Sequence, residues 1–164
     1  MAWVEGTRTA PGMKFALVVA RFNGFVTDRL QTGALDALKS AGVATDDVCV
    51  IKVPGAFEIP FAAKEAASRG NFAAIICLGC LIRGATAHFE YIASACAHGI
   101  TDAAATTGVP MTFGVLTTNS TEEAMERAAD GPDNKGWEAA MAAVEMANVQ
   151  RALRQPRPTS GINI

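Results

Sequence analysis

Short apolar runs alternate with longer segments of helical periodicity along most of this 164-residue chain. Such an alternation predicts parallel strands joined by right-handed helical crossovers, so that helices cover both faces of one sheet. The strand candidates are residues 14–20, 48–53, 73–78 and 111–116. The helix candidates are approximately residues 27–41, 58–69, 86–107, 120–129 and 135–153. We therefore expect an α/β fold in which a four-stranded parallel sheet lies between two layers of helices.

Residues 14–154 contain all of these segments and form one expected domain, a three-layer α/β/α sandwich of flavodoxin-like type. A sheet of four strands is small for such a chain, and its two edge strands would present unpaired backbone groups unless another segment covers them. Residues 1–13 are an N-terminal arm that could add a strand either to this sheet or to the sheet of a neighbouring copy. Residues 155–164 are expected to be a loose C-terminal tail.

Composition argues against several classes of protein. Half of the residues are apolar and 18% are charged, which is incompatible with intrinsic disorder. The formal net charge of −2 argues against a role on nucleic acid or on a membrane surface, since both need a basic excess or patch. No apolar run reaches the roughly 18 residues of a membrane span, and residues 1–14 lack the apolar middle of a signal peptide. We expect a soluble, cytoplasmic protein.

The four cysteines, Cys49, Cys77, Cys80 and Cys96, lie in segments that look buried, and Cys77 and Cys80 form a C-x-x-C pair. A structural zinc site would need a second pair of ligands, which the sequence does not offer. A redox pair of thioredoxin type would need a helix that begins just after the strand, whereas the helical pattern here begins several residues later. The preferred interpretation is two core thiols at the end of a strand, with no metal.

In open parallel sheets, ligands bind beyond the carboxyl ends of the strands. The chemistry-bearing segments at or after the ends of the four predicted strands are residues 21–25, 54–58, 80–88 and 117–119. With Phe113 of the fourth strand, they bring aromatic rings, a carboxylate, an imidazole, cations and a glycine-containing helix start to one edge of the sheet. This combination of groups suits a planar heterocycle together with a phosphate.

The longest predicted helix opens at Gly84-Ala85-Thr86, where free backbone N–H groups and the helix dipole could hold an anion. Thr86 could equally be an ordinary N-cap. His88 falls in the first turn of the same helix, where the dipole would disfavour imidazolium and leave the ring able to accept a proton. The alternative for His88 is a histidine on the helix surface.

Each of the other candidates also has a structural alternative. Glu58 could accept hydrogen bonds from a polyol, or it could simply stabilise a first helical turn. Arg127 could clamp a phosphate through two N–H groups, or it could pair with Glu123 one turn earlier. Lys135, at the start of the last helix, is an exposed cation by default. Three phenylalanines could stack on a ring or belong to the core, namely Phe22, Phe57 and Phe113.

Taken together and in order, these segments resemble the 6,7-dimethyl-8-ribityllumazine synthase family from about Phe15 to Leu153. The most specific stretches are PGAFEIP at residues 54–60 and IRGATAHF at residues 82–89. Shorter matches are ARFN at residues 20–23, LG at 78–79, GVP at 108–110 and NKG at 134–136.

The resemblance implies condensation of 5-amino-6-(D-ribitylamino)uracil with 3,4-dihydroxy-2-butanone 4-phosphate. The products would be phosphate and 6,7-dimethyl-8-ribityllumazine, at the penultimate step of riboflavin biosynthesis. The resemblance implies no metal and no organic cofactor. A flavin-binding protein without turnover, or a shell-forming scaffold without catalysis, is the alternative function.

The resemblance also implies a role for each matching residue. His88 matches the proton-transfer residue. Phe22 matches the aromatic that stacks on the pyrimidine, and Glu58 matches the acceptor of the ribityl hydroxyls. The phosphate-binding positions are Ala85, Thr86 and Arg127. The substrate-binding positions are Phe22, Asn23, Ala56, Phe57, Glu58, Cys80, Leu81, Ile82, Phe113 and Lys135.

Members of this family form pentamers, and in some of them twelve pentamers close into an icosahedral shell of 60 subunits. Their active sites lie between neighbours in the pentamer, so a lone subunit should be inactive. In the family, a longer insertion between the last two helices goes with isolated pentamers. The connection here, residues 128–134, is short, which favours the shell. Two residues depart from the family pattern: Leu81 replaces a more usual valine, and Cys80 occupies a position that varies among small residues.

Overall fold

The computed structural model describes residues 3–155 of the chain. Its four strands are β1 (Phe15–Ala20), β2 (Val48–Val53), β3 (Ala74–Ile82) and β4 (Met111–Thr118). They form one parallel sheet in the order β2-β1-β3-β4, so β1 and β3 are central and β2 and β4 are the edges. All of β1 and the first seven residues of β3 are buried, as expected of parallel strands that are covered on both faces.

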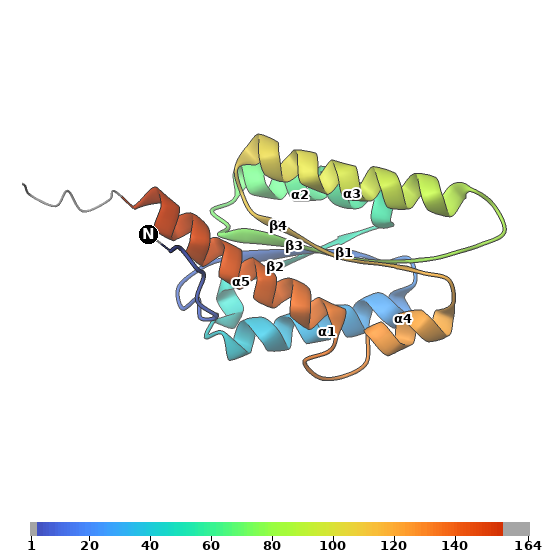
Figure 1. Ribbon diagram of the computed structural model, residues 1–164, viewed down its shortest axis with the longest axis horizontal. Coiled ribbons are helices and arrows are strands. Elements are labelled where there is room, and N and C mark those ends of the chain that lie inside the picture. Colours follow the sequence, from blue (N-terminus) through green and yellow to red (C-terminus); the bar gives the residue numbers. More distant parts are fainter. Residues whose placement is uncertain (1–2, 156–164) are drawn as a thin grey trace, which may run out of the picture.

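Helices cover both faces of the sheet (Figure 1). One face carries α2 (Ile59–Arg69) and α3 (His88–Thr107). The other carries α1 (Gly24–Ser40), α4 (Thr121–Arg127) and α5 (Lys135–Arg154). Single 3-10 turns at Thr45–Asp47 and Ala56–Glu58 precede β2 and α2. The predicted three-layer α/β/α sandwich with a four-stranded parallel sheet is confirmed.

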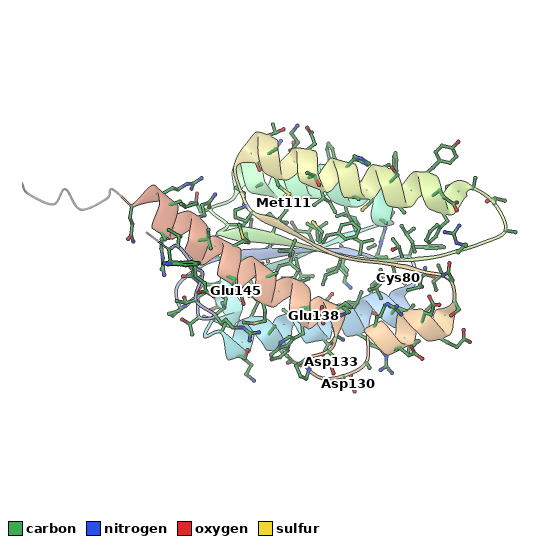
Figure 2. The ribbon with its side chains drawn as sticks, in the orientation of Figure 1. Cys80, Met111, Asp130, Asp133, Glu138 and Glu145 are labelled. Atoms are coloured by element: carbon green, nitrogen blue, oxygen red, sulfur yellow. The ribbon has the colours of Figure 1, made fainter. Side chains whose placement is uncertain are left out.

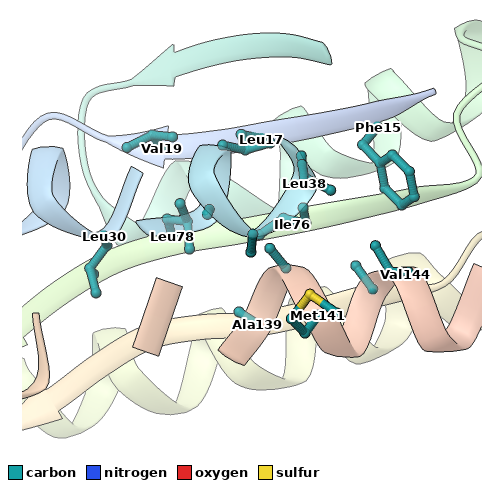
Figure 3. Close-up of a cluster of buried hydrophobic side chains, with 14 of the residues drawn as sticks. Phe15, Leu17, Val19, Leu30, Leu38, Ile76, Leu78, Ala139, Met141 and Val144 are labelled. Carbon is teal, nitrogen blue, oxygen red and sulfur yellow. The ribbon is translucent and has the colours of Figure 1, made fainter. Parts of the chain in front are cut away.

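Each side of the sheet has its own hydrophobic core. Leu17, Ile76 and Val144 belong to the larger core, between the sheet and the helices α1 and α5 (Figure 3). The alternate strand residues, such as Val18 and Ile75, point the other way and pack against α2 and α3. Burying an aliphatic side chain of this size stabilises the fold by about 1.5–3 kcal/mol. The central strands therefore need apolar residues at every position, which is why their runs are so clear in the sequence.

Close packing of α5 against α1 depends on the segment 134–136. A Cβ atom at Gly136 would overlap the backbone carbonyl oxygen of Leu30. The side chain of Asn134 is buried, accepts a hydrogen bond from the backbone N–H of Gly136 at 2.8 Å and donates one to the carbonyl of Arg29 at 3.3 Å. Because Asn134 caps α5 and also joins it to α1, it fixes the place where Lys135 begins the helix.

Two boundaries near the expected site differ from the sequence prediction. β3 continues to Ile82, because its last residues still pair with residues 117–118 of β4. The helix α3 begins at His88 instead of Thr86, and residues 83–87 form the connection between strand and helix. Because β3 is longer than predicted, residues 83–87 lie further from the centre of the sheet than expected.

The described part of the N-terminal arm, residues 3–13, adds no strand to the sheet. The arm lies along α5, where the Asn148 side chain donates to the carbonyls of Thr7 and Thr9 at 3.1 and 3.0 Å. Arg8 also pairs with Glu145 of α5 at 3.3 Å. A strand in the sheet of a neighbouring copy therefore stays a prediction.

Residues 156–164, which make up most of the predicted C-terminal tail, lie outside the described residues. Within residues 3–155, none of the helices combines the length and the apolarity that crossing a bilayer requires. The same part of the chain contains no group of three or more side chains that could hold a metal ion.

Candidate active site

Hydrogen bonds join the segment that follows β1 to the segment that follows β2 and to the end of β3. The backbone N–H of Phe22 donates to the carbonyl of Pro54 at 3.0 Å, and the side-chain amide of Asn23 donates to the carbonyl of Cys80 at 2.9 Å. Asn23 has a φ of 57°, in the left-handed region that asparagine tolerates better than most residues. These contacts fix the chain at Phe22, whose ring stays 69% exposed at this edge of the sheet.

A cavity of about 570 Å³, here termed cavity A, opens beside these segments. Parts of its wall follow β1, β2 and β3, as expected for a ligand site at the carboxyl edge of a parallel sheet. The predicted site residues that line it are Phe22, Ala56, Phe57, Glu58, Leu81, Ile82, Thr86 and His88. Cavity A thus combines aromatic and aliphatic walls with a carboxylate, a hydroxyl and an imidazole.

A second cavity of about 470 Å³, here termed cavity B, runs along the outer edge of β4. Residues 112–117 form one wall, and Arg127 of α4 with Lys135 and Glu138 of α5 form the other (Figure 2 labels Glu138). Lys135 donates to Glu138 at 2.7 Å. Phe113 lies on this edge with 46% of its surface exposed. Cavity B therefore presents cations and an aromatic ring beside a free strand edge.

The predicted site residues that line a cavity are divided between these two, which share no lining residue. Phe113 pairs with Cys77 across the sheet, whereas Leu81 of cavity A lies four residues further along β3. That offset is roughly 13 Å of strand. One copy of the chain therefore does not bring Phe113, Arg127 and Lys135 into cavity A.

The start of α3 differs from the sequence expectation in one respect. The N-cap position is occupied by Ala87, with no side-chain capping bond, so Thr86 is not the N-cap. His88 is the first residue of the helix and is exposed at the rim of cavity A. The first N–H groups of a helix have no backbone partner within it, and the N-cap residue Ala87 gives them no side-chain bond. A helix start of this kind can hold an anion, and the anion site predicted at residues 84–86 stays a prediction.

The alternatives for Arg127 and Glu58 can now be compared with the structure. Arg127 donates to the backbone carbonyl of Glu123 at 3.1 Å, and no ion pair joins the two side chains. The carboxylate of Glu123 instead accepts from the backbone N–H of Asn119 at 3.0 Å. Glu58 makes no side-chain capping bond to α2 and lines cavity A. Each side chain therefore lines a cavity, and a ligand-binding role for either stays a prediction.

One of the four cysteines is not buried as expected. Cys77, Cys80 and Cys96 are buried thiols, which confirms core packing, but Cys49 on the edge strand β2 is exposed, contrary to expectation. Burial raises the pKa of Cys80 and that of Cys96 to about 11. Burial, and secondarily the neighbouring Cys96, raises the pKa of Cys77 as well.

Cys80 belongs to the site only through its backbone. Its side chain packs in the core on the α1–α5 side of the sheet, and its carbonyl holds Asn23. Figure 2 places Cys80 toward one end of the sheet and Met111, the first residue of β4, toward the other. Neither Asn23 nor Ala85 is among the lining residues of the two cavities. Asn23 supports Phe22, and Ala85 is exposed in the connection before α3.

Sequence reasoning gave no site role to several residues that line the cavities. Gly55 and Phe89 belong to the two long motifs, and Ile92 follows His88 by one helical turn. The spacing of four residues puts Ile92 on the same helix face as His88, which was a usable signal. Glu138 stands three residues after Lys135 on α5 and pairs with it, which the same helical spacing indicates.

Comparison with known proteins adds an independent finding. The family model described as 6,7-dimethyl-8-ribityllumazine synthase matches residues 12–151, which include all four strands and the lining residues of both cavities. The protein of that name from Syntrophus aciditrophicus (strain SB) is 52% identical over 149 residues, which cover 91% of this chain and 97% of the relative. The protein of the same name from Desulfatibacillum aliphaticivorans is 49% identical over 151 residues, or 92% and 97% of the two chains.

Proposed function

This chain belongs to the 6,7-dimethyl-8-ribityllumazine synthase family, and from that premise we propose the reaction and the residues that carry it. The enzyme condenses 5-amino-6-(D-ribitylamino)uracil with 3,4-dihydroxy-2-butanone 4-phosphate. The products are 6,7-dimethyl-8-ribityllumazine and phosphate, at the penultimate step of riboflavin biosynthesis. The observation that carries this function is cavity A, whose aromatic, carboxylate and imidazole groups come from the two motifs most specific to the family.

The ribitylaminouracil binds in cavity A. The pyrimidine stacks on the exposed ring of Phe22, since a flat aromatic surface favours a flat heterocycle. The segment 56–58 holds the ribityl chain, and the Glu58 carboxylate accepts hydrogen bonds from its hydroxyls. Leu81 and Ile82 form the apolar wall behind the ring. Because Leu81 is larger than the valine usual in the family, it narrows this part of the cavity.

The butanone phosphate binds at the start of α3. Its phosphate meets the connection at Ala85 and Thr86 and the free N–H groups of the first turn. Arg127 offers a fork of donors that matches a phosphate, but it lines cavity B of its own copy. A complete phosphate site therefore requires Arg127 from a neighbouring copy, and the same copy would supply Phe113 and Lys135 to the substrate.

The chemistry needs positioning and proton transfer. The 5-amino group attacks the ketone, and loss of water gives an imine; phosphate then leaves, and ring closure by the ribitylamino nitrogen releases a second water. His88, at the rim of cavity A and next to the phosphate segment, accepts and returns the protons of these steps. The amine is already a nucleophile, so holding both substrates together contributes most of the acceleration.

Each copy offers cavity A on one surface and cavity B on another, so a closed ring would complete the site in every copy. We infer a pentamer, as in the family, and favour the 60-subunit shell because the connection between α4 and α5 is short. The partners are thus the two substrates and further copies of this chain. The cytoplasmic location and the absence of nucleic-acid and membrane partners stay predictions.

The direct test mixes purified protein with both substrates and follows the fluorescent lumazine and free phosphate together. Equal amounts of both products, formed faster than in a protein-free mixture, would support the proposed reaction. A folded and assembled protein that does not exceed that background would contradict it. The flavin-binding and scaffold alternatives would then be examined by flavin titration and light scattering.

A further inference from the structure

Arg83 lies between β3 and the connection that leads into α3, and its guanidinium has three partners. One N–H bonds to the carboxylate of Glu90, and Nε donates to the side-chain oxygen of Asn119 at 3.0 Å. The guanidinium also lies over the ring of Phe89, 4.4 Å from its centroid. Its backbone N–H donates to the carbonyl of Thr118 at 2.9 Å, next to the last paired residues of β3 and β4.

These partners lie on two different elements. Phe89 and Glu90 belong to the first turn of α3, whereas Asn119 follows β4. Asn119 is itself held, since its backbone N–H donates to the carboxylate of Glu123 at 3.0 Å. Arg83 therefore ties the first turn of α3 to the end of β4, across the connection formed by residues 84–87.

The connection has little other support among the described residues. Residues 83–88 are exposed, Ala87 gives no side-chain cap, and a Cβ atom at Gly84 would meet nothing within 4 Å. Yet this segment carries Thr86 and leads directly to His88, two of the residues that line cavity A. Arg83 itself is not among the residues that line the cavity.

We propose that Arg83 is a positioning residue, which acts through Glu90, Phe89 and Asn119 to hold the start of α3 in the geometry that receives the phosphate group of the substrate. This inference rests on the proposed function of the same site. A phosphate site made of backbone N–H groups depends on their relative orientation, so a loose connection would lower its affinity even with every contact residue present.

The competing explanation is that the positive charge of Arg83 acts directly on the phosphate. Substitution of Glu90 distinguishes this explanation from the positioning role. The hydrogen bond from Arg83 holds the pKa of Glu90 below its ordinary value, so the carboxylate is charged at neutral pH. If charge alone mattered, Glu90→Gln would remove a negative group near the anion and tighten its binding. If Glu90 anchors Arg83, the same substitution loosens the connection and weakens binding.

The experiment measures the affinity of the assembled protein for inorganic phosphate by calorimetry, together with the KM for each substrate. The variants are Arg83→Gln, Arg83→Lys and Glu90→Gln, with Lys39→Gln and Glu122→Gln as exposed controls of matching charge change. We expect Arg83→Gln and Glu90→Gln each to weaken phosphate binding and to raise the KM for the butanone phosphate about fivefold, the upper end for an exposed ion pair. The KM for the ribitylaminouracil should change much less, and both control variants should behave as wild type.

Arg83→Lys keeps the charge but loses the planar fork, so its phosphate affinity should resemble that of Arg83→Gln. Tighter or unchanged phosphate binding in Glu90→Gln would overturn the inference, as would wild-type affinity in Arg83→Lys. Wild-type protein that binds no phosphate would overturn it too. Absence of turnover in wild type contradicts the proposed function separately, since the phosphate affinities of the variants are measured without turnover.

Discussion

His88 and Glu58 are the ionisable side chains that line cavity A in the described part of the chain, and they have different tasks. In the proposed reaction Glu58 binds the ribityl chain, whereas His88, the first residue of α3, transfers protons beside the proposed phosphate segment. A proton shuttle assists a reaction whose nucleophile is already competent. The loss of one such group should therefore slow the reaction without stopping it.

His88→Ala should lower kcat roughly 10²-fold, the low end for general acid–base catalysis, with a small effect on either KM. His98→Ala is the matched control, because His98 is exposed in the middle of α3 and bonds to the Ser94 carbonyl of its own helix. Initial rates of lumazine formation measure both variants. A folded, assembled His88→Ala protein with no activity above the spontaneous reaction would show that His88 does more than shuttle protons.

The thiols give a second prediction for single residues. In the native protein, a thiol reagent should modify Cys49 quickly, while the three buried cysteines react only after unfolding. Burial raises the pKa of Cys80 and Cys96 from the ordinary 9.0 to about 11, so the unfolded chain loses these protons first as the pH rises. This contribution to stability is complete below pH 9 and is lost progressively between pH 9 and pH 11. Rapid native modification of Cys80 would contradict core burial.

At the scale of helices and strands, the sequence predicts the structure best for strands that are buried on both faces of the sheet. The runs of β1 and β3 are apolar at every position because cores cover both of their faces, and such runs are hard to misread. The ends of elements are less predictable. β3 continues to Ile82 because β4 continues beside it, and α3 begins only at His88, after a connection whose first residue, Arg83, bonds to Thr118 and Asn119. Both boundaries depend on pairing between distant segments, which local periodicity does not encode.

Packing between α1 and α5 yields a prediction for these elements. Gly136→Ala would place a methyl group on the carbonyl of Leu30 and force the helices apart, at a cost of about 2 kcal/mol or more. Gly24→Ala is the control, because the only neighbour within 4 Å of its added Cβ is a carboxylate oxygen of Asp28 at 3.9 Å. Thermal or urea unfolding compares the two variants. Equal stability of Gly136→Ala and wild type would mean that the close contact between these helices is dispensable.

At the scale of the whole molecule, the site residues were predictable as a set but not as an arrangement. The motifs and the family resemblance identified eight of the residues that line cavity A, together with Phe113, Arg127 and Lys135 of cavity B. The separation of Phe113, Arg127 and Lys135 from cavity A follows from the position of β4 at the edge of the sheet. Strand order depends on long-range pairing, so only the structure shows that these residues line two separate cavities of one copy.

The most direct measurement of the shared site is complementation between two inactive variants. Thr86→Glu places a negative charge beside the bound phosphate from the side of cavity A. Arg127→Glu places one beside the same phosphate from cavity B of the neighbouring copy. Each variant alone should be inactive. When the two are expressed together and assemble at random, about a quarter of the sites combine an intact cavity A with an intact cavity B of the next copy. Lumazine formation should return to about that fraction of the wild-type rate. No recovery in a mixed, fully assembled preparation would contradict a site shared between neighbouring copies.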